Sequence, residues 1–226
     1  MERANVIITN NKKEALDIIL YHITELLKIK KEIVLGLPGG RSIQSFFHMM
    51  VDEEKIPWAK IHIFMVDERL VSLNHEHSNY KMVRENFLDN LIAKKKISEK
   101  NIHPFVFEKF TILEYENELK KYGGKFDIVI LGVGEDGHVA ALYPNASIKK
   151  EAEYFFELHD SPKPPKDRMT ASRKLILKSS LGLFLFLGES KRAAYEKFKD
   201  KTISVEDCPA KLAYKLKESI VLTDLE

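Results

Sequence analysis

The stretch from Asp127 to His138, DIVILGVGEDGH, joins a continuous apolar run to a glycine-rich turn that ends in a histidine. An unbroken run of isoleucine, valine and leucine is typical of a strand that is buried on both faces, as in a parallel sheet. Other short apolar runs of this kind lie at Val6–Ile8, Ile33–Leu35, Ile61–Val66, Leu181–Leu187 and Ile220–Leu222. The pattern predicts a sheet of mostly parallel strands.

Helical signals alternate with these strands. After the first strand, apolar residues recur at steps of three and four, at Leu16, Ile19, Leu20, Ile23, Leu26 and Leu27. Further helices are expected from about Ile43 to Val51, from Tyr80 to Leu91 with Ser78 as cap, from a Thr111 capping box to Gly123, from a Ser190 cap through Phe198, and after Pro209. The alternation predicts an α/β fold, with a mostly parallel twisted sheet covered by helices on both faces.

The overall composition is that of an ordinary globular protein. The chain has 226 residues, of which 44% are hydrophobic and 31% are charged, and its formal net charge is +2. Residues 1–226 contain no repeat, low-complexity tract or long linker, so we expect a single domain. Because both signs of charge are mixed along the chain, nothing indicates a nucleic-acid partner.

Three features of the sequence indicate where in the cell the protein is located. Its longest apolar run, Leu181–Leu187, is far shorter than the roughly 20 residues that a membrane span needs, so no membrane association is expected. The segment Met1–Val6 lacks the pattern of a secretory signal, and the single cysteine, Cys208, cannot form an internal disulfide. These features predict a cytoplasmic location.

In parallel sheets, ligands bind at the carboxyl ends of strands, so the loops that follow strands are the places to look for function. The first such loop, LPGGRS at residues 37–42, contains Gly39 and Gly40. Free backbone amides at the start of a helix favour an anion such as phosphate, although a turn that simply requires glycine has the same pattern. No Gly-Lys-Ser/Thr follows, so the loop is not a nucleotide-binding P-loop.

The second loop places Asp67, Glu68 and Arg69 directly after a strand. Arg69 is a candidate for binding an anionic substrate or a developing oxyanion, and a solvated turn is the alternative. His75 and His77 follow closely. We interpret them as solvated histidines, because no third metal ligand has a recognisable spacing.

The third loop, residues 131–138, contains Gly-x-Gly-x-x-Gly after a strand, which is the pattern of a dinucleotide-binding turn. That fingerprint should open a long helix, and Pro144 restricts any helix here, so we give dinucleotide binding little weight. A histidine at this place, His138, can exchange protons near neutral pH, and Asp136 can orient it. A purely structural histidine remains the alternative.

Two later loops carry basic side chains. Three prolines stiffen residues 161–170, which present Arg168, and Lys191 lies near the predicted start of a helix. A cation is unfavourable at that end of a helix, and a bound anion would resolve the conflict. A surface excursion without function is the alternative for the proline-rich loop.

Taken in order, these segments resemble the 6-phosphogluconolactonase family, within the superfamily that includes glucosamine-6-phosphate deaminase. The matching segments are Gly39-Gly40-Arg41-Ser42, Asp67-Glu68-Arg69 with Ser78-Asn79, Gly132 to Ala140, Ser161 to Pro165 with Arg168-Met169-Thr170, and Gly188-Glu189-Ser190-Lys191. The deaminases have Asp-Glu-Tyr where this chain has Asp67-Glu68-Arg69, and Asn-Glu-Pro where it has Leu142-Tyr143-Pro144. Both differences favour a lactonase.

The resemblance implies a Rossmann-like fold and hydrolysis of 6-phosphogluconolactone, a reaction of the oxidative pentose phosphate pathway. It implies His138 as the general base, Asp136 as the group that orients it and Arg69 as the oxyanion-stabilising group. The implied phosphate ligands are Gly39, Gly40, Arg41, Ser42, Arg168 and Lys191. We expect a monomer that binds a phosphorylated sugar lactone and needs no cofactor or metal, because an ester carbonyl is already electrophilic. The alternatives are a glucosamine-6-phosphate deaminase and a non-catalytic sugar-phosphate-binding domain.

Overall fold

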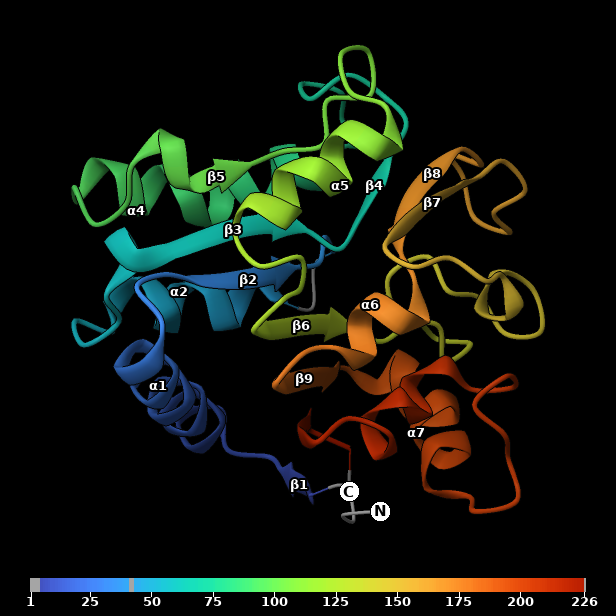
Figure 1. Ribbon diagram of the computed structural model, residues 1–226. Helices are drawn as coiled ribbons and strands as arrows, with labels where there is room; N and C mark the ends of the chain where they lie inside the picture. The colour runs from blue at the N-terminus through green and yellow to red at the C-terminus, as the bar shows by residue number, and fades with distance from the viewer. Residues whose placement is uncertain (1–4, 41–42, 226) are drawn as a thin grey trace.

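Seven parallel strands form the central sheet of the computed structural model, which describes residues 5–40 and 43–225 (Figure 1). Each strand pairs in parallel with its neighbours, which confirms the predicted mostly parallel sheet. In spatial order the strands are β1 (Asn5–Thr9), β10 (Glu218–Thr223), β9 (Leu181–Phe186), β6 (Ile128–Gly132), β2 (Ile33–Leu37), β3 (Ile61–Met65) and β5 (Ile102–His103).

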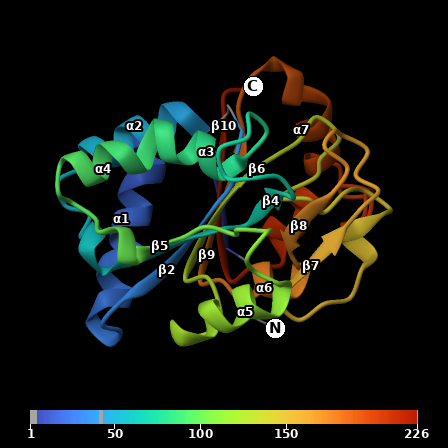
Figure 2. The same cartoon turned by 90° about the horizontal axis from the view of Figure 1, so that it is seen from above.

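Helices cover both faces of this sheet, as predicted, and Figure 2 shows the two layers on either side of it. One layer comprises α1 (Lys12–Ile29), α2 (Gln44–Asp52), α3 (Asn79–Val83) and α4 (Asp89–Ala93), with a π-helical turn at Arg84–Leu88 between the last two. The other comprises α5 (Ile112–Lys121), α6 (Arg173–Leu177), α7 (Arg192–Lys199) and a 3-10 helix at Pro209–Tyr214. Shorter 3-10 turns lie at Trp58–Lys60, Glu99–Asn101, Ser147–Lys149 and Glu189–Lys191.

Side-chain alternation along the strands divides the core into two clusters, one under each layer of helices. In β2, Ile33, Leu35 and Leu37 pack under α1 and α2, whereas Val34 packs on the opposite side. This is the period of two that a strand imposes when both of its faces are covered. Within the described part of the chain, no helix is both long and apolar enough to span a membrane.

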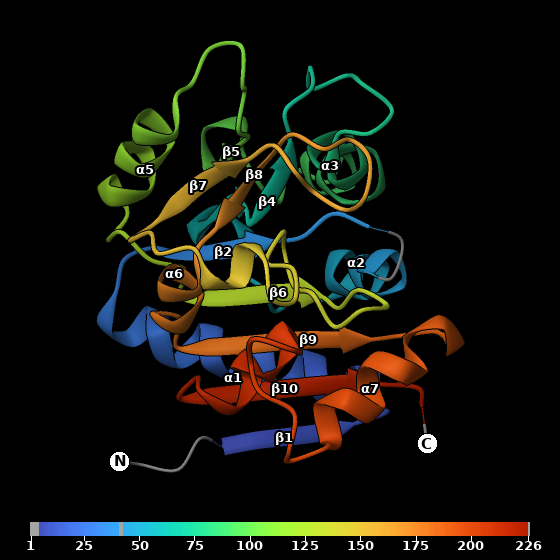
Figure 3. The ribbon, with the colours of Figure 1, turned by 90° about the vertical axis from the view of Figure 1, so that its right-hand side faces the viewer.

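A second, antiparallel sheet of three strands lies on the α5 side of the molecule (Figure 3). It consists of β4 (Asp67–Arg69), β8 (Arg168–Ala171) and β7 (Phe155–Leu158), in the order β4-β8-β7. The sequence predicted loops at residues 67–69 and 168, because strands this short and this charged lack an apolar pattern. This small sheet brings residues 67–69 next to residues 168–170.

Local capping signals were confirmed at two helices and were wrong at a third. Ser78 accepts a hydrogen bond from the Lys81 amide at the start of α3, and Thr111 forms a capping box at the start of α5. Ser190, predicted to cap the helix that runs through Phe198, instead lies inside the 3-10 turn that precedes α7. That extra turn makes residue 191, not 190, the N-cap position.

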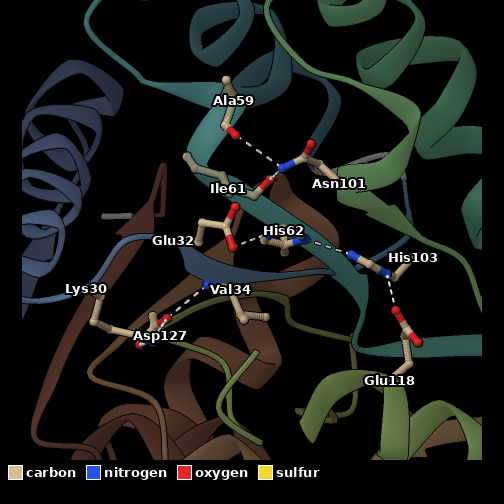
Figure 4. A network of polar contacts seen from close by, with 10 residues as sticks. All are labelled: Lys30, Glu32, Val34, Ala59, Ile61, His62, Asn101, His103, Glu118 and Asp127. Atoms are coloured by element: carbon tan, nitrogen blue, oxygen red, sulfur yellow. Dashed lines mark hydrogen bonds and ion pairs between the residues drawn. The ribbon is translucent and has the colours of Figure 1, made fainter. Parts of the chain in front are cut away.

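Figure 4 shows a polar network at the amino-terminal ends of the central strands. The Asp127 carboxylate is fully buried, accepts two hydrogen bonds from Lys30 at 2.8 and 2.6 Å, and accepts a third from the Val34 amide at 2.9 Å. Nearby, Nδ1 of His62 and Nε2 of His103 are hydrogen bonded at 2.9 Å. The network therefore ties together the strand ends opposite those that carry the predicted site.

Candidate active site

A cavity of about 350 Å³ opens at the carboxyl ends of β2, β6 and β9. The order of strands reverses between β2 and β6, because β3 lies beyond β2 on one side and β9 lies beyond β6 on the other. At such a reversal the connections leave in opposite directions and open a crevice that parallel-sheet proteins use for ligands. Six of the residues predicted from the sequence line this cavity: Gly39, Gly40, Arg69, His138, Arg168 and Lys191.

The small sheet brings two of the predicted arginines together. Arg69 on β4 lies directly opposite Arg168 on β8. Asp67 is two residues before Arg69, so both side chains project from the same face of β4, and both line the cavity. Burial lowers the pKa of Arg168, and the positive charge of Arg69 lowers it further. Two like charges held this close favour an anionic ligand between them.

The guanidinium of Arg168 also organises the proline-rich loop. Its Nε donates to the carbonyl of Pro165 at 3.1 Å, and Nη2 donates to the carbonyls of Lys163 and Pro164 at 3.1 and 3.2 Å. Arg168 is only 3% exposed, and its other terminal nitrogen, Nη1, has no hydrogen-bond partner among the described residues. Arg168 therefore both holds the loop and keeps hydrogen-bonding capacity for a ligand.

Glu68 points to the opposite face of β4 and fixes the start of α3. Its carboxylate accepts hydrogen bonds at 2.7 Å from the amides of Arg69, Asn79 and Tyr80, and at 3.1 Å from the Ser78 hydroxyl. Burial raises the pKa of Glu68 to about 7, although the backbone hydrogen bonds act in the other direction. The carboxylate joins two segments that are ten residues apart and places Asn79 at the cavity.

The loop between β6 and Val139 holds the predicted general base. The Gly134 amide donates to the His138 carbonyl at 2.8 Å, and the Gly137 amide donates to the Gly134 carbonyl at 3.0 Å. A Cβ on Gly134 would lie 2.0 Å from the His138 ring, so glycine is required here to make room for the imidazole. Gly137 has a φ of +92°, which favours glycine. The glycine pattern is thus explained by how the loop packs around His138.

Asp136 and His138 form a close pair, in which Nδ1 of the imidazole is hydrogen bonded to Oδ1 of the carboxylate. The His138 backbone amide donates to the same oxygen at 3.2 Å. Burial opposes ionisation of Asp136, but the hydrogen bonds and the charge of His138 outweigh it and hold the pKa of the carboxyl well below its usual range. Because a carboxylate can only accept, Nδ1 carries the hydrogen and Nε2 is left as the basic nitrogen.

Tyr143 was not predicted as a site residue and lies beside His138. Its ring centroid is 4.7 Å from that of His138, and its hydroxyl accepts a hydrogen bond from Ser161 at 3.0 Å. Burial raises the pKa of Tyr143. Its position in Leu142-Tyr143-Pro144 was noticed only as a difference from the deaminases, and the ring contact with His138 depends on the folded loop.

The cavity also contains Asp67, Asn79 and Lys163, which the sequence did not assign to the site. Lys163 belongs to the same proline-rich loop as Arg168. Its positive charge in that loop is the signal by which the sequence could have identified it. Asp67 and Asn79 were noticed only within the motifs. Arg41 and Ser42, which were predicted to contact phosphate, lie outside the described residues. His75 and His77 are exposed, and the described residues contain no cluster of histidine, cysteine and acidic side chains suited to a metal.

The chain resembles proteins of known name over most of its length. The family model for glucosamine-6-phosphate isomerases/6-phosphogluconolactonase matches residues 10–222. A 6-phosphogluconolactonase from Borreliella burgdorferi is 34% identical over 197 residues, which cover 85% of this chain and 83% of that protein.

Solved structures give the same result for the fold. A 6-phosphogluconolactonase from Thermotoga maritima superposes with a TM-score of 0.81 and 25% identity, covering 98% of this chain and 99% of that one. A monomeric glucosamine-6-phosphate deaminase has the same fold, with a TM-score of 0.77 and 22% identity over 97% of this chain and 96% of that one. This chain therefore belongs to the glucosamine-6-phosphate isomerase/6-phosphogluconolactonase family.

Proposed function

We propose that this protein is a 6-phosphogluconolactonase, which uses water to open the ring of 6-phosphogluconolactone and gives 6-phosphogluconate. The observation that carries the proposal is the convergence of His138, Arg69, Arg168 and Lys191 on one cavity. Lactonases and a deaminase share the fold, so the residues must decide between them. Arg69 and Tyr143 stand where deaminases have tyrosine and glutamate, and both line the cavity beside the base.

The phosphate of the substrate binds, in this proposal, to the cationic part of the cavity. Arg168 and Lys191 supply charge, and the backbone amides of Gly39 and Gly40 supply further donors. Hydrogen bonds from charged donors to an anion are roughly twice as strong as neutral ones, so a doubly charged phosphate is the part of the substrate that these groups hold best.

The lactone carbonyl then lies near His138. Nε2 of His138 removes a proton from water as the water oxygen attacks the carbonyl carbon, and the carbonyl oxygen becomes negatively charged. Arg69, which lines the cavity, stabilises this oxyanion, and its Nη1 donates to the carbonyl of His77 at 2.6 Å, which holds the guanidinium in place. Collapse of the intermediate breaks the bond to the ring oxygen, which takes the proton back from His138. Asp136 keeps the imidazole oriented throughout.

The test is acid release from freshly prepared 6-phosphogluconolactone, with the spontaneous rate subtracted. His138→Ala should lower turnover by roughly a hundredfold or more, which is the usual contribution of a general base. His159→Ala is the matched control, because His159 is an exposed histidine outside the cavity. Full activity of His138→Ala would contradict the assigned role, and release of ammonia from glucosamine 6-phosphate would favour the deaminase.

We further propose that the chain acts as a monomeric single domain in the cytoplasm. The two core clusters share the central sheet, so neither half has an independent core. The Cys208 thiol is buried and free, which suits a reducing compartment. Sedimentation of the purified protein tests the oligomeric state, and a dimer at micromolar concentration would contradict it.

A further inference from the structure

Asp67 is a buried carboxylate in a cavity that is otherwise rich in cations. The side chain lines the cavity, and the residue is only 6% exposed. Arg69, Lys163 and Arg168 line the same cavity, yet none of the three forms an ion pair with Asp67 within the described residues. A buried carboxylate without an ion pair is unfavourable unless hydrogen bonds satisfy it, so its retention here needs an explanation.

One side of the Asp67 carboxylate is held by Asn79. The Asn79 amide group donates from Nδ2 to Oδ2 of Asp67 and also to its backbone carbonyl, both at 3.0 Å. Asn79 is itself fixed by the hydrogen bond from its backbone amide to Glu68. A Cβ on Gly39 would lie 1.9 Å from Oδ1 of Asn79, so the glycine loop packs closely against the same amide. Asp67 is therefore oriented by a chain of contacts that runs from Glu68 through Asn79.

The other oxygen of the Asp67 carboxylate, Oδ1, accepts no hydrogen bond from Asn79. It has no hydrogen-bond partner among residues 5–40 and 43–225, and it is not among the fully buried unpartnered atoms of that part of the chain. Because Asp67 lines the cavity and Oδ1 is not fully buried, a ligand in the cavity can reach this oxygen. An ionised carboxylate only accepts hydrogen bonds, so its partner must be a donor.

The substrate of the proposed reaction has a limited set of donors. Its phosphate and its lactone carbonyl are acceptors, which a carboxylate repels. The hydroxyl groups on C2, C3 and C4 are the only groups on the lactone that donate. Asp67 thus fits the hydroxylated carbons that lie between the phosphate and the carbonyl, which the cationic residues do not recognise.

We propose that Asp67, oriented by Asn79, accepts a hydrogen bond from one ring hydroxyl and makes the enzyme selective for lactones that carry it. The inference rests on the proposed function and adds a specificity residue to the same site. A hydrogen bond to a charged group typically corresponds to roughly 10- to 100-fold in affinity or rate. A site with a committed acceptor also rejects an analogue that leaves the acceptor unpaired.

The experiment compares kcat/KM of the wild type for 6-phosphogluconolactone and for its 2-deoxy, 3-deoxy and 4-deoxy analogues. One analogue should be poorer by roughly 10- to 100-fold. In Asp67→Asn, the amide oxygen can keep the hydrogen bond from Asn79 while an NH2 group replaces the free acceptor. This variant should lose a similar factor on the full substrate and should no longer distinguish the poor analogue.

The control is Asp160→Asn, because Asp160 is an exposed aspartate near the proline-rich loop that does not line the cavity. It should keep the wild-type selectivity. If Asp67→Asn does not fold, as judged by circular dichroism, Asp67→Ala is measured on the same four substrates.

Two results overturn the inference while leaving the proposed function intact: a wild type that hydrolyses all three analogues as well as the parent lactone, or an Asp67 variant that loses the same factor on every substrate. A wild type without any lactonase activity contradicts the proposed function itself and the inference with it.

Discussion

The imidazole of His138 occupies the space that a side chain on residue 134 would need. A Cβ on Gly134 would lie 2.0 Å from Cε1 and Nδ1 of the ring and 2.7 Å from Oδ1 of Asp136. The ring cannot move away freely, because it is hydrogen bonded to Asp136 on one side and packs against Tyr143 on another. The position of the proposed base therefore depends on the absence of a side chain at residue 134.

Gly134→Ala should accordingly lower turnover strongly while leaving the fold intact. Displacing a catalytic group by about 1 Å can cost on the order of a hundredfold in rate, and a methyl group at residue 134 demands a shift of that size. The measurement is kcat for lactone hydrolysis alongside thermal unfolding. Glu135→Ala, at an exposed residue of the same loop, should have wild-type kcat. Wild-type turnover in Gly134→Ala would show that the His138 position is not critical.

Substitutions at Cys208 should change turnover, because Cys208 packs against Gly137 in the loop that carries His138. A Cβ on Gly137 would lie 2.8 Å from Sγ of Cys208, and the Gly137 carbonyl accepts a hydrogen bond from the Ala210 amide at 2.9 Å. Cys208→Leu adds volume to a closely packed contact and should push the loop that carries His138, which lowers kcat and stability together. Cys208→Ala removes volume and should retain most of the activity. Equal kcat values in the two variants would contradict this coupling.

Asp127 should be a major contributor to stability. Asp127→Asn breaks the buried interaction with Lys30 and weakens the hydrogen bond from Val34, so the free energy of unfolding should fall by about 3 kcal/mol. Chemical denaturation measures it. Asp17→Asn is the control, because Asp17 pairs with Lys13 in an exposed ion pair and its loss should leave stability almost unchanged. An equal loss in the free energy of unfolding for Asp127→Asn and Asp17→Asn would contradict this role of Asp127.

The buried histidine pair should make the protein less stable in mild acid. Burial lowers the pKa of His103 to about 4, and the charge of His62 adds to this effect. Between pH 4 and 6.5 the unfolded chain therefore binds more protons than the folded one, so the free energy of unfolding falls as the pH falls through this window. The full effect is about 3 kcal/mol, since one pKa unit corresponds to about 1.4 kcal/mol.

Denaturation curves between pH 4 and 7 test this expectation with His103→Phe, which keeps a ring that can stack on Phe64. The variant should show a flatter dependence of stability on pH than the wild type. His159→Phe, at an exposed histidine, should show the wild-type dependence. The raised pKa of Glu68 acts in the opposite sense, but it is common to all three proteins. Parallel curves for wild type and His103→Phe would contradict the prediction.

The central sheet was predictable because its strands carry their own signal. The run from Ile128 to Leu131 is apolar on both faces, and α1 repeats its apolar residues at helical spacing, so each element is visible in isolation. The small sheet was not predictable in this way. Asp67–Arg69 has no apolar alternation, and it becomes a strand only because Arg168–Ala171 lies alongside it.

In the candidate site, too, some residues could be identified from local sequence and others only from the folded structure. Residues whose chemistry is unusual for their local setting, such as Arg69 and Lys191, were identified from the sequence and line the cavity. Asp67 was attributed to a motif but given no role, because its significance depends on its place in the cavity and on a hydrogen bond from Asn79, twelve residues away. Such relations exist only once β4 and α3 are in place.

The sequence by itself determined the α/β class, the order of the strands and helices along the chain, and the loops in which chemistry was to be sought, because hydrophobic periodicity and glycine act over a few neighbouring residues. The tertiary structure alone decided that β6 lies between β2 and β9, that a second sheet carries Arg69 and Arg168, and that Asp67 lines the cavity with Asn79 beside it. Contacts between residues distant in sequence depend on how the elements pack, and no local pattern records that packing.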